Sequence, residues 1–550
     1  MKKITFSFFF IFLILSAKSQ SKEDTLRQIG EMAYWMDLDF TLTERDSMLS
    51  GLNDNKDIYN AMHRISVPNR QPFPFAFQPN IQGTSIPQKQ EIVSWVIPAN
   101  ISLPSKQSDL AFYSILQLAS LLKNRKITSV ELTRYFLDRL KKFNDSLLCV
   151  VSLTEDIAIQ QARQADIEIR NGKYRGPLHG IPFGLKDLFA VKGTKTTWGS
   201  RPYKDQVIAE DAFVYKQLKN AGAVLCAKLS LGALAYDDLW FGGKTRNPWN
   251  LKQGSSGSSA GSASATAAGL VPFAIGTETW GSIISPSTRC GVTGLRPTFG
   301  SVSRSGAMVL SWSLDKAGPI CRSAEDAAIV FYYLKGTDGK DPSAVNRAFN
   351  YSGKADFKKL RIAYAGNYFN NLSKTSLQWN VLETLRKAGA SLSEVTFPDS
   401  TIYPFNIMDP VISAESAAAF DELTRSNRDD LIERQDKNFW PNIFRTSRFI
   451  PAVEYINANR HRYSLMEGLN DFMKNYDVII VPTFSGNQTA ITNLSGHPVV
   501  CIPAGFLPNG SPASITFIAN LYDEATLLAV AKAFQDRTDH HKKHPPLFSN

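Results

Sequence analysis

The stretch from residue 254 to residue 300 holds the residue types that nucleophilic catalysis requires. It opens on small residues (GSSGSSAGSASATAAG), continues through an apolar run (LVPFAI) and reaches a second Gly/Ser turn (GTETWGS). Because these two turns carry few long side chains, their backbone N–H groups can approach a bound group closely. A serine nucleophile needs such a setting: a hydroxyl, a neighbouring base, and N–H groups directed at a developing oxyanion.

Serine and glycine in such number are also typical of a flexible linker. The flanking residues argue against a linker, since 260–268 are small residues that tolerate a helix and 270–275 form an apolar run of buried-strand length. Packed core does not normally follow a linker directly. The sequence therefore predicts a turn, a helix of small residues, a strand and a second turn.

One candidate nucleophile comes from a short motif. Residues 257–261 match G-x-S-x-G, which would make Ser259 the nucleophile of a hydrolase elbow, with His497 or His540 as its base. Such an elbow requires a strand directly before it, and the preceding RNPWNLKQGSS does not have a strand pattern. We therefore treat the elbow as the weaker alternative.

A different candidate base is Lys186, which lies within IPFGLKDLFAV. A lone lysine among apolar residues most often sits at a strand end with its ammonium group in water. Lysine accepts a proton only when it is neutral, so its pKa would have to fall from the free value of about 10.4. Burial among Ile181, Phe183, Leu185 and Leu188 would lower the pKa in that direction.

Several sequence motifs occur in a specific order along the chain. GIPFGLKDLFAVKG surrounds Lys186, GSSAGSASATAAGLVPFAIGTETWGSI begins at Gly257, and CGVTGLRPTFGSVSRSGA begins at Cys290. SLDKAGPICRSAEDAA then begins at Ser313, and NLSGHPVVCIPAGF begins at Asn493. With these motifs the chain resembles the amidase signature family over residues 109–540.

The resemblance implies a Ser–cis-Ser–Lys triad. Ser282, which ends GTETWGS, matches the nucleophile of the family, and Ser258 matches the bridging serine whose peptide bond is cis. Lys186 matches the terminal base. A hydroxyl both donates and accepts a hydrogen bond, so Ser258 can relay a proton between the other two residues. The expected reaction is hydrolysis of an amide through an acyl-enzyme, without a cofactor.

The turn that ends at the expected nucleophile departs from the family pattern. The oxyanion hole is expected at four backbone N–H groups, those of Thr279, Trp280, Gly281 and Ser282. Trp280 stands where glycine is common, and we expect its indole to enter the acyl pocket. Ile284 stands where arginine is usual, so the usual acid–arginine pair is missing, and Arg289 is the candidate partner of Glu278 instead. These changes leave the three triad residues in place, and they bear on which substrate the site accepts.

Strand-like and helix-like segments alternate from residue 109 onward, and no stretch rich in Pro, Gly, Ser or charge divides the chain. We expect an α/β fold with one large domain at 109–540, in which helices cover both faces of a central mixed sheet. Residues 21–108 are expected to form an N-terminal helical cap and an extended arm. The segment 400–470, with aromatic and charged residues at helical spacing, is expected to be a helical insertion that shapes the pocket.

The first twenty residues have the features of a secretory signal peptide. Lys2 and Lys3 precede an apolar run at 4–15, and the small residues Ala17 and Ser19 fit a cleavage site. The apolar run is too short to span a bilayer comfortably, so an uncleaved anchor is the weaker alternative. We expect the mature protein to be periplasmic or secreted.

The charge balance argues against a nucleic-acid partner. The 61 basic and 50 acidic residues give a net charge of +11, and loss of the three lysines in the first twenty residues lowers it to +8. This excess is spread along the chain without a basic stripe or interleaved aromatic residues.

The five cysteines lie far apart in mostly apolar surroundings, so buried free thiols are expected rather than disulfides: Cys149, Cys226, Cys290, Cys321 and Cys501. The histidines do not have the spacing of a metal site, and no metal is expected.

Together these patterns indicate an exported serine amidohydrolase whose partner is a small-molecule amide. Three alternatives remain open: the glutaminase subunit of a tRNA-dependent amidotransferase, an esterase with the same triad, and a non-catalytic binding protein on the same fold. The export signal argues against the first, because such a complex works in the cytoplasm. The joint presence of Lys186, Ser258 and Ser282 argues against the last. No stable membrane anchor is expected, and a homodimer is an open alternative to a monomer.

Overall fold

The computed structural model describes residues 21–64, 69, 75–80, 89–399 and 405–549. These residues divide into two compact units, one that contains 21–64 with 449–451 and one that contains the other described residues. The predicted signal peptide at 1–20 lies outside the described residues. None of the described helices is both long and apolar enough to cross a bilayer.

The smaller unit contains two helices, α1 (Lys22–Tyr34) and α2 (Leu42–His63). The side chain of Ser21 caps α1 by accepting a hydrogen bond from the backbone N–H of Asp24. Lys22 of α1 pairs with Asp46 of α2 at 2.6 Å. The helical part of the expected N-terminal cap therefore corresponds to a pair of helices.

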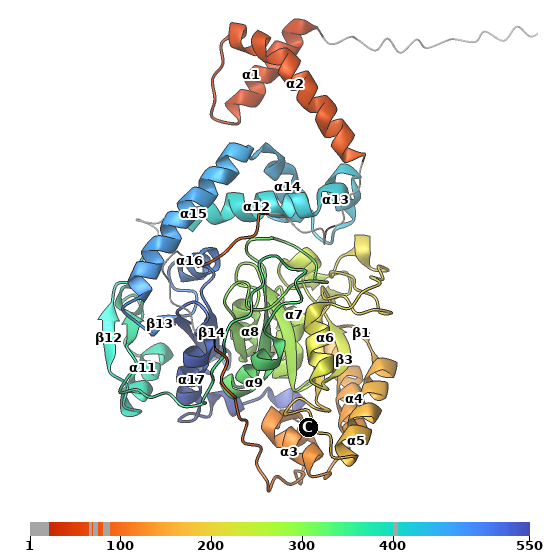
Figure 1. Ribbon diagram of the computed structural model, residues 1–550, viewed down its shortest axis with the longest axis vertical. Coiled ribbons are helices and arrows are strands. Elements are labelled where there is room, and N and C mark those ends of the chain that lie inside the picture. The colour runs from red at the N-terminus through yellow and green to blue at the C-terminus, as the bar shows by residue number, and fades with distance from the viewer. Residues whose placement is uncertain (1–20, 65–68, 70–74, 81–88, 400–404, 550) are drawn as a thin grey trace, which may run out of the picture. The chain divides into compact units, whose positions relative to one another are not determined.

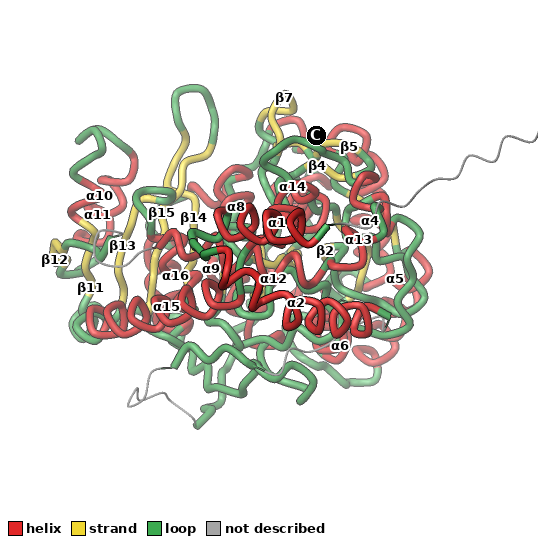
Figure 2. Tube along the Cα trace, turned by 90° about the horizontal axis from the view of Figure 1, so that it is seen from above, coloured by secondary structure: helices red, strands yellow, loops and turns green. Residues whose placement is uncertain are grey.

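The larger unit is built on an eleven-stranded mixed sheet with the strand order β1-β3-β2-β8-β10-β9-β14-β15-β13-β11-β12. Its strands are β1 (Val150–Leu153), β2 (Pro182–Lys186), β3 (Val224–Leu229), β8 (Phe273–Glu278), β9 (Thr293–Arg296), β10 (Lys316–Cys321), β11 (Ile362–Ala365), β12 (Leu392–Val395), β13 (Val478–Pro482), β14 (Val499–Phe506) and β15 (Pro512–Ala519). Strand β2 runs parallel to both β3 and β8, whereas β8 and β10 are antiparallel. Figure 2 shows β12, β11, β13, β15 and β14 following one another across the sheet.

Alternation along the strands sends neighbouring side chains to opposite faces of this sheet. In β13, Val478 and Ile480 join one hydrophobic core cluster, and Ile479 and Val481 join a second. The first cluster contains side chains of α3 (Ile115–Lys123), α9 (Ala324–Leu334), α11 (Leu377–Lys387) and α17 (Glu524–Gln535). The second contains side chains of α7 (Ala260–Ala267), α8 (Ile284–Cys290), α15 (Ala452–Met473) and α16 (Gln488–Ser495). Helices therefore cover both faces of a mixed sheet, which confirms the predicted α/β fold (Figure 1).

The helices of the larger unit are α3 (Ile115–Lys123), α4 (Ser129–Leu147), α5 (Glu155–Arg170), α6 (Phe213–Asn220), α7 (Ala260–Ala267), α8 (Ile284–Cys290), α9 (Ala324–Leu334), α10 (Gly366–Phe369), α11 (Leu377–Lys387), α12 (Met408–Ala419), α13 (Asp421–Arg425), α14 (Trp440–Thr446), α15 (Ala452–Met473), α16 (Gln488–Ser495) and α17 (Glu524–Gln535). Local sequence signals account for many of these bounds. Thr128 and Glu131 form a capping box at the start of α4. The strand expected at 270–275 begins only after Pro272, because proline has no N–H to give to the sheet.

Most of the described part of the segment expected to be a helical insertion lies in helices, although 432–439 do not. Helices α12, α13, α14 and α15 lie together in Figure 1, and short 3-10 turns at 428–431 and 447–449 lie in the connections between them. The expected extended arm is described in part: residues 89–106 contain no helix or strand. The side chain of Gln90 donates to the carbonyl O of Phe349 at 3.0 Å, which ties this segment to the main body. All five cysteines are buried free thiols, as predicted.

Candidate active site

Lys186 is the last residue of β2, and its side chain is fully buried. Its Nζ donates hydrogen bonds to Ser258 Oγ and Thr277 Oγ1, both at 2.8 Å, and to Ser259 Oγ at 3.1 Å. Thr277 lies near the end of β8, which runs parallel to β2, so the two strand ends meet here. The common alternative for a lone lysine, an ammonium group in water at a strand end, does not hold for Lys186.

The surroundings of Lys186 change its acidity. Burial lowers the pKa of Lys186 to about 7, although the carboxylates of Asp315 and Glu278 act to raise it. Near neutral pH, a large fraction of this lysine is therefore the neutral amine. A neutral amine at hydrogen-bond distance from Ser258 can accept a proton from its hydroxyl.

Ser258 lies in a turn whose backbone is closely packed. The peptide bond between Gly257 and Ser258 is cis, as the family resemblance implies. Ser258 is 1% exposed. A Cβ atom at Gly257 would lie 1.8 Å from the carbonyl O of Asp237, so no residue larger than glycine fits there without backbone movement.

Two hydrogen bonds join this turn to the turn that holds Ser282. The backbone N–H of Ser259 donates to the carbonyl O of Ser282 at 3.1 Å. The hydroxyls of Ser256 and Ser285 lie 2.7 Å apart. The structure thus brings Lys186, Ser258 and Ser282 together, although 96 positions separate the first from the last in the sequence.

The hydroxyl of Ser259 is engaged with the backbone rather than directed at a substrate. It accepts a hydrogen bond from the N–H of Thr277 at 3.1 Å and donates to the carbonyl O of Thr277 at 3.0 Å. The expectation that no strand precedes Ser259 is wrong, because β7 (Asn250–Gly254) lies just before it. However, β7 pairs with β6 (Arg246–Asn247) in a separate two-stranded sheet and does not belong to the central sheet. His497 is buried beside Ser495, where burial lowers the pKa of its imidazole to about 3. This geometry does not support a hydrolase elbow at Ser259.

Four consecutive N–H groups precede or belong to the expected nucleophile. The backbone N–H groups of Thr279, Trp280, Gly281 and Ser282 donate no hydrogen bond to any described residue. Gly281 has a φ of 87°, which turns the chain between Trp280 and Ser282 and which a side chain rarely adopts. Ser282 is 8% exposed, and its hydroxyl is likewise free of hydrogen bonds to the described residues. Such N–H groups are suited to a negatively charged oxygen.

Glu278, at the end of β8, anchors the turn that holds Ser282. Its Oε2 accepts hydrogen bonds from the N–H groups of Ile283 and Ile284 at 2.9 and 3.0 Å. Its Oε1 accepts a hydrogen bond from the guanidinium of Arg296 at 2.9 Å. The expected partner Arg289 is wrong, because that residue lies on the exposed side of α8, whereas Arg296 ends β9 inside the sheet. An acid–arginine pair is therefore present, with its arginine at a different position.

The two substituted positions beside the turn have different surroundings. Trp280 keeps its φ outside the left-handed region, and its side chain is 43% exposed. The indole therefore stands partly in solvent rather than packed into the protein. Ile284 is buried at the start of α8 and contributes its N–H to Glu278.

Removing the charge of Glu278 is expected to destabilise the fold strongly. Burial raises the pKa of Glu278, but the Arg296 guanidinium and the N–H of Ile284 outweigh burial and lower it to about 2. Glu278→Gln leaves the guanidinium buried without its counter-charge, which costs about 3–5 kcal/mol of unfolding free energy. Equilibrium urea unfolding at pH 7 measures this loss.

The matched control is Glu383→Gln, which removes one partner of the exposed Glu383–Lys387 pair on α11. Exposed pairs contribute less than about 1 kcal/mol, so this variant should unfold at nearly the wild-type urea concentration. The deficit of Glu278→Gln should shrink as the pH falls below about 4.5. Stability from a carboxylate whose pKa is lowered is present above the unfolded pKa and is lost towards the folded pKa. Equal losses in the two variants would contradict the structural role of Glu278.

The sequence reasoning missed three contacts at this site. Thr277 binds Lys186, Arg296 binds Glu278, and Asp315 Oδ1 accepts a hydrogen bond from Thr279 Oγ1 at 2.6 Å. The first two missed residues lie in the motifs GTETWGS and CGVTGLRPTFG, and Asp315 lies in SLDKAGP. The sequence signal that could have indicated these contacts is that all three missed residues are polar residues inside the motifs.

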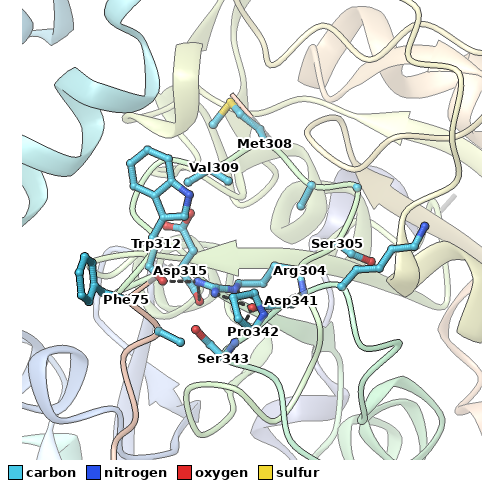
Figure 3. Close-up of a pocket in the computed structure, with 14 residues that line it drawn as sticks. Phe75, Arg304, Ser305, Met308, Val309, Trp312, Asp315, Asp341, Pro342 and Ser343 are labelled. Carbon is cyan, nitrogen blue, oxygen red and sulfur yellow. Dashed lines mark hydrogen bonds and ion pairs between the residues drawn. The ribbon is translucent and has the colours of Figure 1, made fainter. Parts of the chain in front are cut away.

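A cavity of about 60 Å³ lies beside the chain that leads into β10 (Figure 3). Its lining residues come from 75–76, 304–309, 312, 315 and 340–343. The guanidinium of Arg304 points at Asp341, with Trp312 and Asp315 next to it. None of these residues belongs to 400–470, so a pocket shaped by that segment stays a prediction.

Comparison with known proteins agrees with this geometry. The family model described as Amidase matches residues 131–492. The A subunit of the glutamyl-tRNA(Gln) amidotransferase of Coxiella burnetii is 33% identical over 481 residues, covering 79% of this chain and 99% of that protein. The chain belongs to the amidase signature family. It is therefore a hydrolase that acts on amide bonds.

Solved structures share the fold of this amidase. The peptide amidase of Stenotrophomonas maltophilia superposes with a TM-score of 0.71 at 28% identity, covering 78% of this chain and 98% of that one. The A subunit of the glutamyl-tRNA(Gln) amidotransferase of Thermotoga maritima gives a TM-score of 0.64 at 25% identity, covering 78% and 95%. Each of these three comparisons leaves about a fifth of this amidase uncovered.

Proposed function

We propose that this amidase is an exported serine amidohydrolase that cleaves a carboxylic amide through an acyl-enzyme on Ser282. The observation that carries the proposal is the contact at 2.8 Å between Lys186 Nζ and Ser258 Oγ, in a place closed to water. A buried lysine with a pKa of about 7 is a base at neutral pH. No cofactor takes part in the proposed reaction.

The proposed reaction begins with attack of Ser282 Oγ on the amide carbonyl carbon. The proton of Ser282 passes to Ser258 Oγ, while the proton of Ser258 passes to the neutral Lys186 amine. The N–H groups of residues 279–282 stabilise the oxyanion of the tetrahedral intermediate. Ser258 then returns a proton to the leaving nitrogen, the C–N bond breaks, and water hydrolyses the remaining ester by the same relay.

The expected signal peptide at 1–20 supports export to the periplasm or beyond. The small-molecule amide is a proposed partner, and nothing in the charge pattern favours a nucleic acid. The peptide amidase of Stenotrophomonas maltophilia makes peptide amides the first substrates to test.

A second candidate is release of ammonia from glutamine, which is the reaction of a glutaminase subunit. The 33% identity to the amidotransferase of Coxiella burnetii favours it, because that relative aligns along nearly its whole length. The expected export signal favours the first proposal, since an amidotransferase complex works in the cytoplasm.

Labelling with a fluorophosphonate probe tests the proposed chemistry. The probe should modify Ser282, as mapped by peptide mass spectrometry, and Lys186→Ala should remove the modification because the nucleophile loses its base. Ammonia release from a dipeptide C-terminal amide and from L-glutamine then separates the two candidate functions.

A modified Ser259 would instead indicate the hydrolase elbow. A folded protein that neither reacts with the probe nor releases ammonia would indicate the binding-protein alternative. Turnover of a carboxylic ester but of neither amide would indicate an esterase.

A further inference from the structure

The turn that holds Ser282 is tied to a second loop through one short hydrogen bond. Thr279 Oγ1 donates to Asp315 Oδ1 at 2.6 Å, and both side chains are more than nine-tenths buried. Thr279 follows β8 and Asp315 precedes β10, and the two strands pair directly at Glu278 and Lys316. Asp315 therefore reaches the first of the four free N–H residues from the neighbouring strand.

Asp315 itself is held within residues 310–315, called here the 310–315 loop. Its Oδ2 accepts hydrogen bonds from the N–H groups of Leu310 at 2.8 Å and Ser311 at 3.0 Å. On another side, the guanidinium of Arg304 donates to the carbonyl O of Trp312 at 2.8 Å (Figure 3). The carboxylate position thus depends on the conformation of the whole loop.

A buried carboxylate from the segment 400–470 holds the 310–315 loop. Glu415, on α12, accepts hydrogen bonds from the hydroxyl of Ser311 at 2.5 Å and from the N–H and hydroxyl of Ser313 at 3.0 and 2.7 Å. The hydroxyl of Tyr455, on α15, donates to the same carboxylate at 2.8 Å. Among the described residues, Glu415 therefore receives four hydrogen bonds, three of them from the 310–315 loop.

A buried arginine of α15 holds the loop at the same residue. Arg462 donates to the hydroxyl and to the carbonyl O of Ser313, both at 2.9 Å. The hydroxyl of Ser313 accepts from Arg462 and donates to Glu415, so it lies between the two charged groups. The Nε of Arg462 donates to the carbonyl O of Leu494 at 2.6 Å, which fixes the guanidinium from the opposite direction.

Stability alone does not account for these buried charges. Apolar side chains of similar volume often stabilise a protein as well as a buried set of charges does, because desolvation offsets the attraction. Burial lowers the pKa of Arg462 to about 10, which shows that the site disfavours its charge even with Glu415 nearby. The charged groups instead determine the geometry of the 310–315 loop, since each of their hydrogen bonds to the loop fixes one of its atoms.

We propose that Glu415 and Arg462 are positioning residues of the amide-hydrolysing site, which fix the 310–315 loop so that Asp315 holds Thr279 and the oxyanion-binding N–H groups in place. The inference rests on the proposed function of Ser282. By this proposal, the segment 400–470 affects the rate of the reaction through the 310–315 loop, rather than only lining the site.

The test is a double-mutant cycle read as the second-order rate constant for fluorophosphonate labelling of Ser282. Glu415→Gln puts an amide N–H₂ against hydrogen-bond donors of the loop, and Thr279→Val removes the bond to Asp315. Each variant should slow labelling by about 10–100-fold, the size of a misplaced or lost oxyanion contact. Because both act through one bond, the double variant should be no slower than the slower single variant.

Asp409→Asn is the matched control, since Asp409 is an exposed carboxylate on the same helix with no hydrogen bond to a described residue. It should label within about twofold of wild type. The final labelled fraction gives a second readout, because a purely structural role lowers the amount of active protein and leaves the rate constant of that fraction unchanged.

Two results would overturn the inference, and a third would overturn the proposed function on which it rests. Fold-changes that multiply in the double variant, or a wild-type rate constant in Glu415→Gln, would overturn it. If Glu415→Gln does not fold, Ser313→Ala replaces it in the same cycle. Ser313→Ala alone should slow labelling by about 3–10-fold, and adding it to Thr279→Val should cause no further slowing. Absence of labelling at Ser282 in the wild-type protein would overturn the proposed function itself, which separates the two failures.

Discussion

Ser282→Ala should lower kcat for amide hydrolysis by at least about 10⁴-fold, because no other hydroxyl in the turn is placed to form the acyl-enzyme. The substituted side chain is small and makes no hydrogen bond to a described residue through its hydroxyl, so the fold should be retained. Initial rates of ammonia release from a peptide amide, at saturating substrate, measure the effect.

Ser264→Ala is the matched control for this substitution. Ser264 lies on α7, within the same serine-rich stretch, and its hydroxyl donates to the carbonyl O of Arg246 at 2.8 Å, away from Lys186. It should keep kcat within a few-fold of wild type. Full activity in Ser282→Ala, with a normal thermal unfolding midpoint, would remove Ser282 from the mechanism and direct attention to Ser259.

Lys186→Met should lower kcat/KM by about 10³-fold or more, because the relay from Ser282 through Ser258 then ends without a base. In the wild-type protein, kcat/KM should rise about tenfold per pH unit below pH 7 and level off above it. The sign follows from the pKa of Lys186, about 7, since only the neutral amine accepts a proton. Initial rates between pH 5 and pH 9 give the profile.

Lys186→Met should also change how stability depends on pH. Burial lowers the pKa of Lys186 from 10.5 to about 7, so folding disfavours the protonated lysine. This destabilisation is fully present below pH 7 and disappears as the pH rises towards the unfolded pKa. Relative to Lys186→Met, the wild-type protein should therefore become more stable between pH 7 and pH 10.

The matched control is Lys195→Met, at an exposed lysine that pairs with Asp205 at 2.7 Å. It should leave both the activity profile and the pH dependence of stability almost unchanged. A kcat/KM that stays flat from pH 5 to pH 9 in the wild-type protein would contradict the assignment of Lys186 as the base.

Two local features with clear sequence signals, a helix capping box and a buried strand, were predictable from the sequence. The capping box at Thr128 and Glu131 depends on residues three apart, and the strand at 478–482 depends on a continuous apolar run. Burial of Lys186 did not follow from its apolar neighbours alone, because a lone lysine in such a setting most often keeps its ammonium group in water. The order of the motifs then indicated which serines accompany this lysine.

Contacts between distant residues depended on the tertiary structure. From the sequence, Arg289 was expected to be the partner of Glu278, whereas the partner is Arg296, seven positions further along. The first lies on an exposed helix face and the second ends a central strand. The pairing of β9 with β10, and of β10 with β8, decides between them.

The sequence by itself determined the elements, the fold class and the candidates for the chemistry, because these depend on neighbouring residues and on ordered motifs. Only the tertiary structure decided what surrounds them. Glu415 lies 100 positions beyond Asp315, and no local pattern links the two. The two residues are linked through Ser311, which bonds to both, because a helix packs across a loop between two strands. Strand register and helix packing are properties of the whole folded chain.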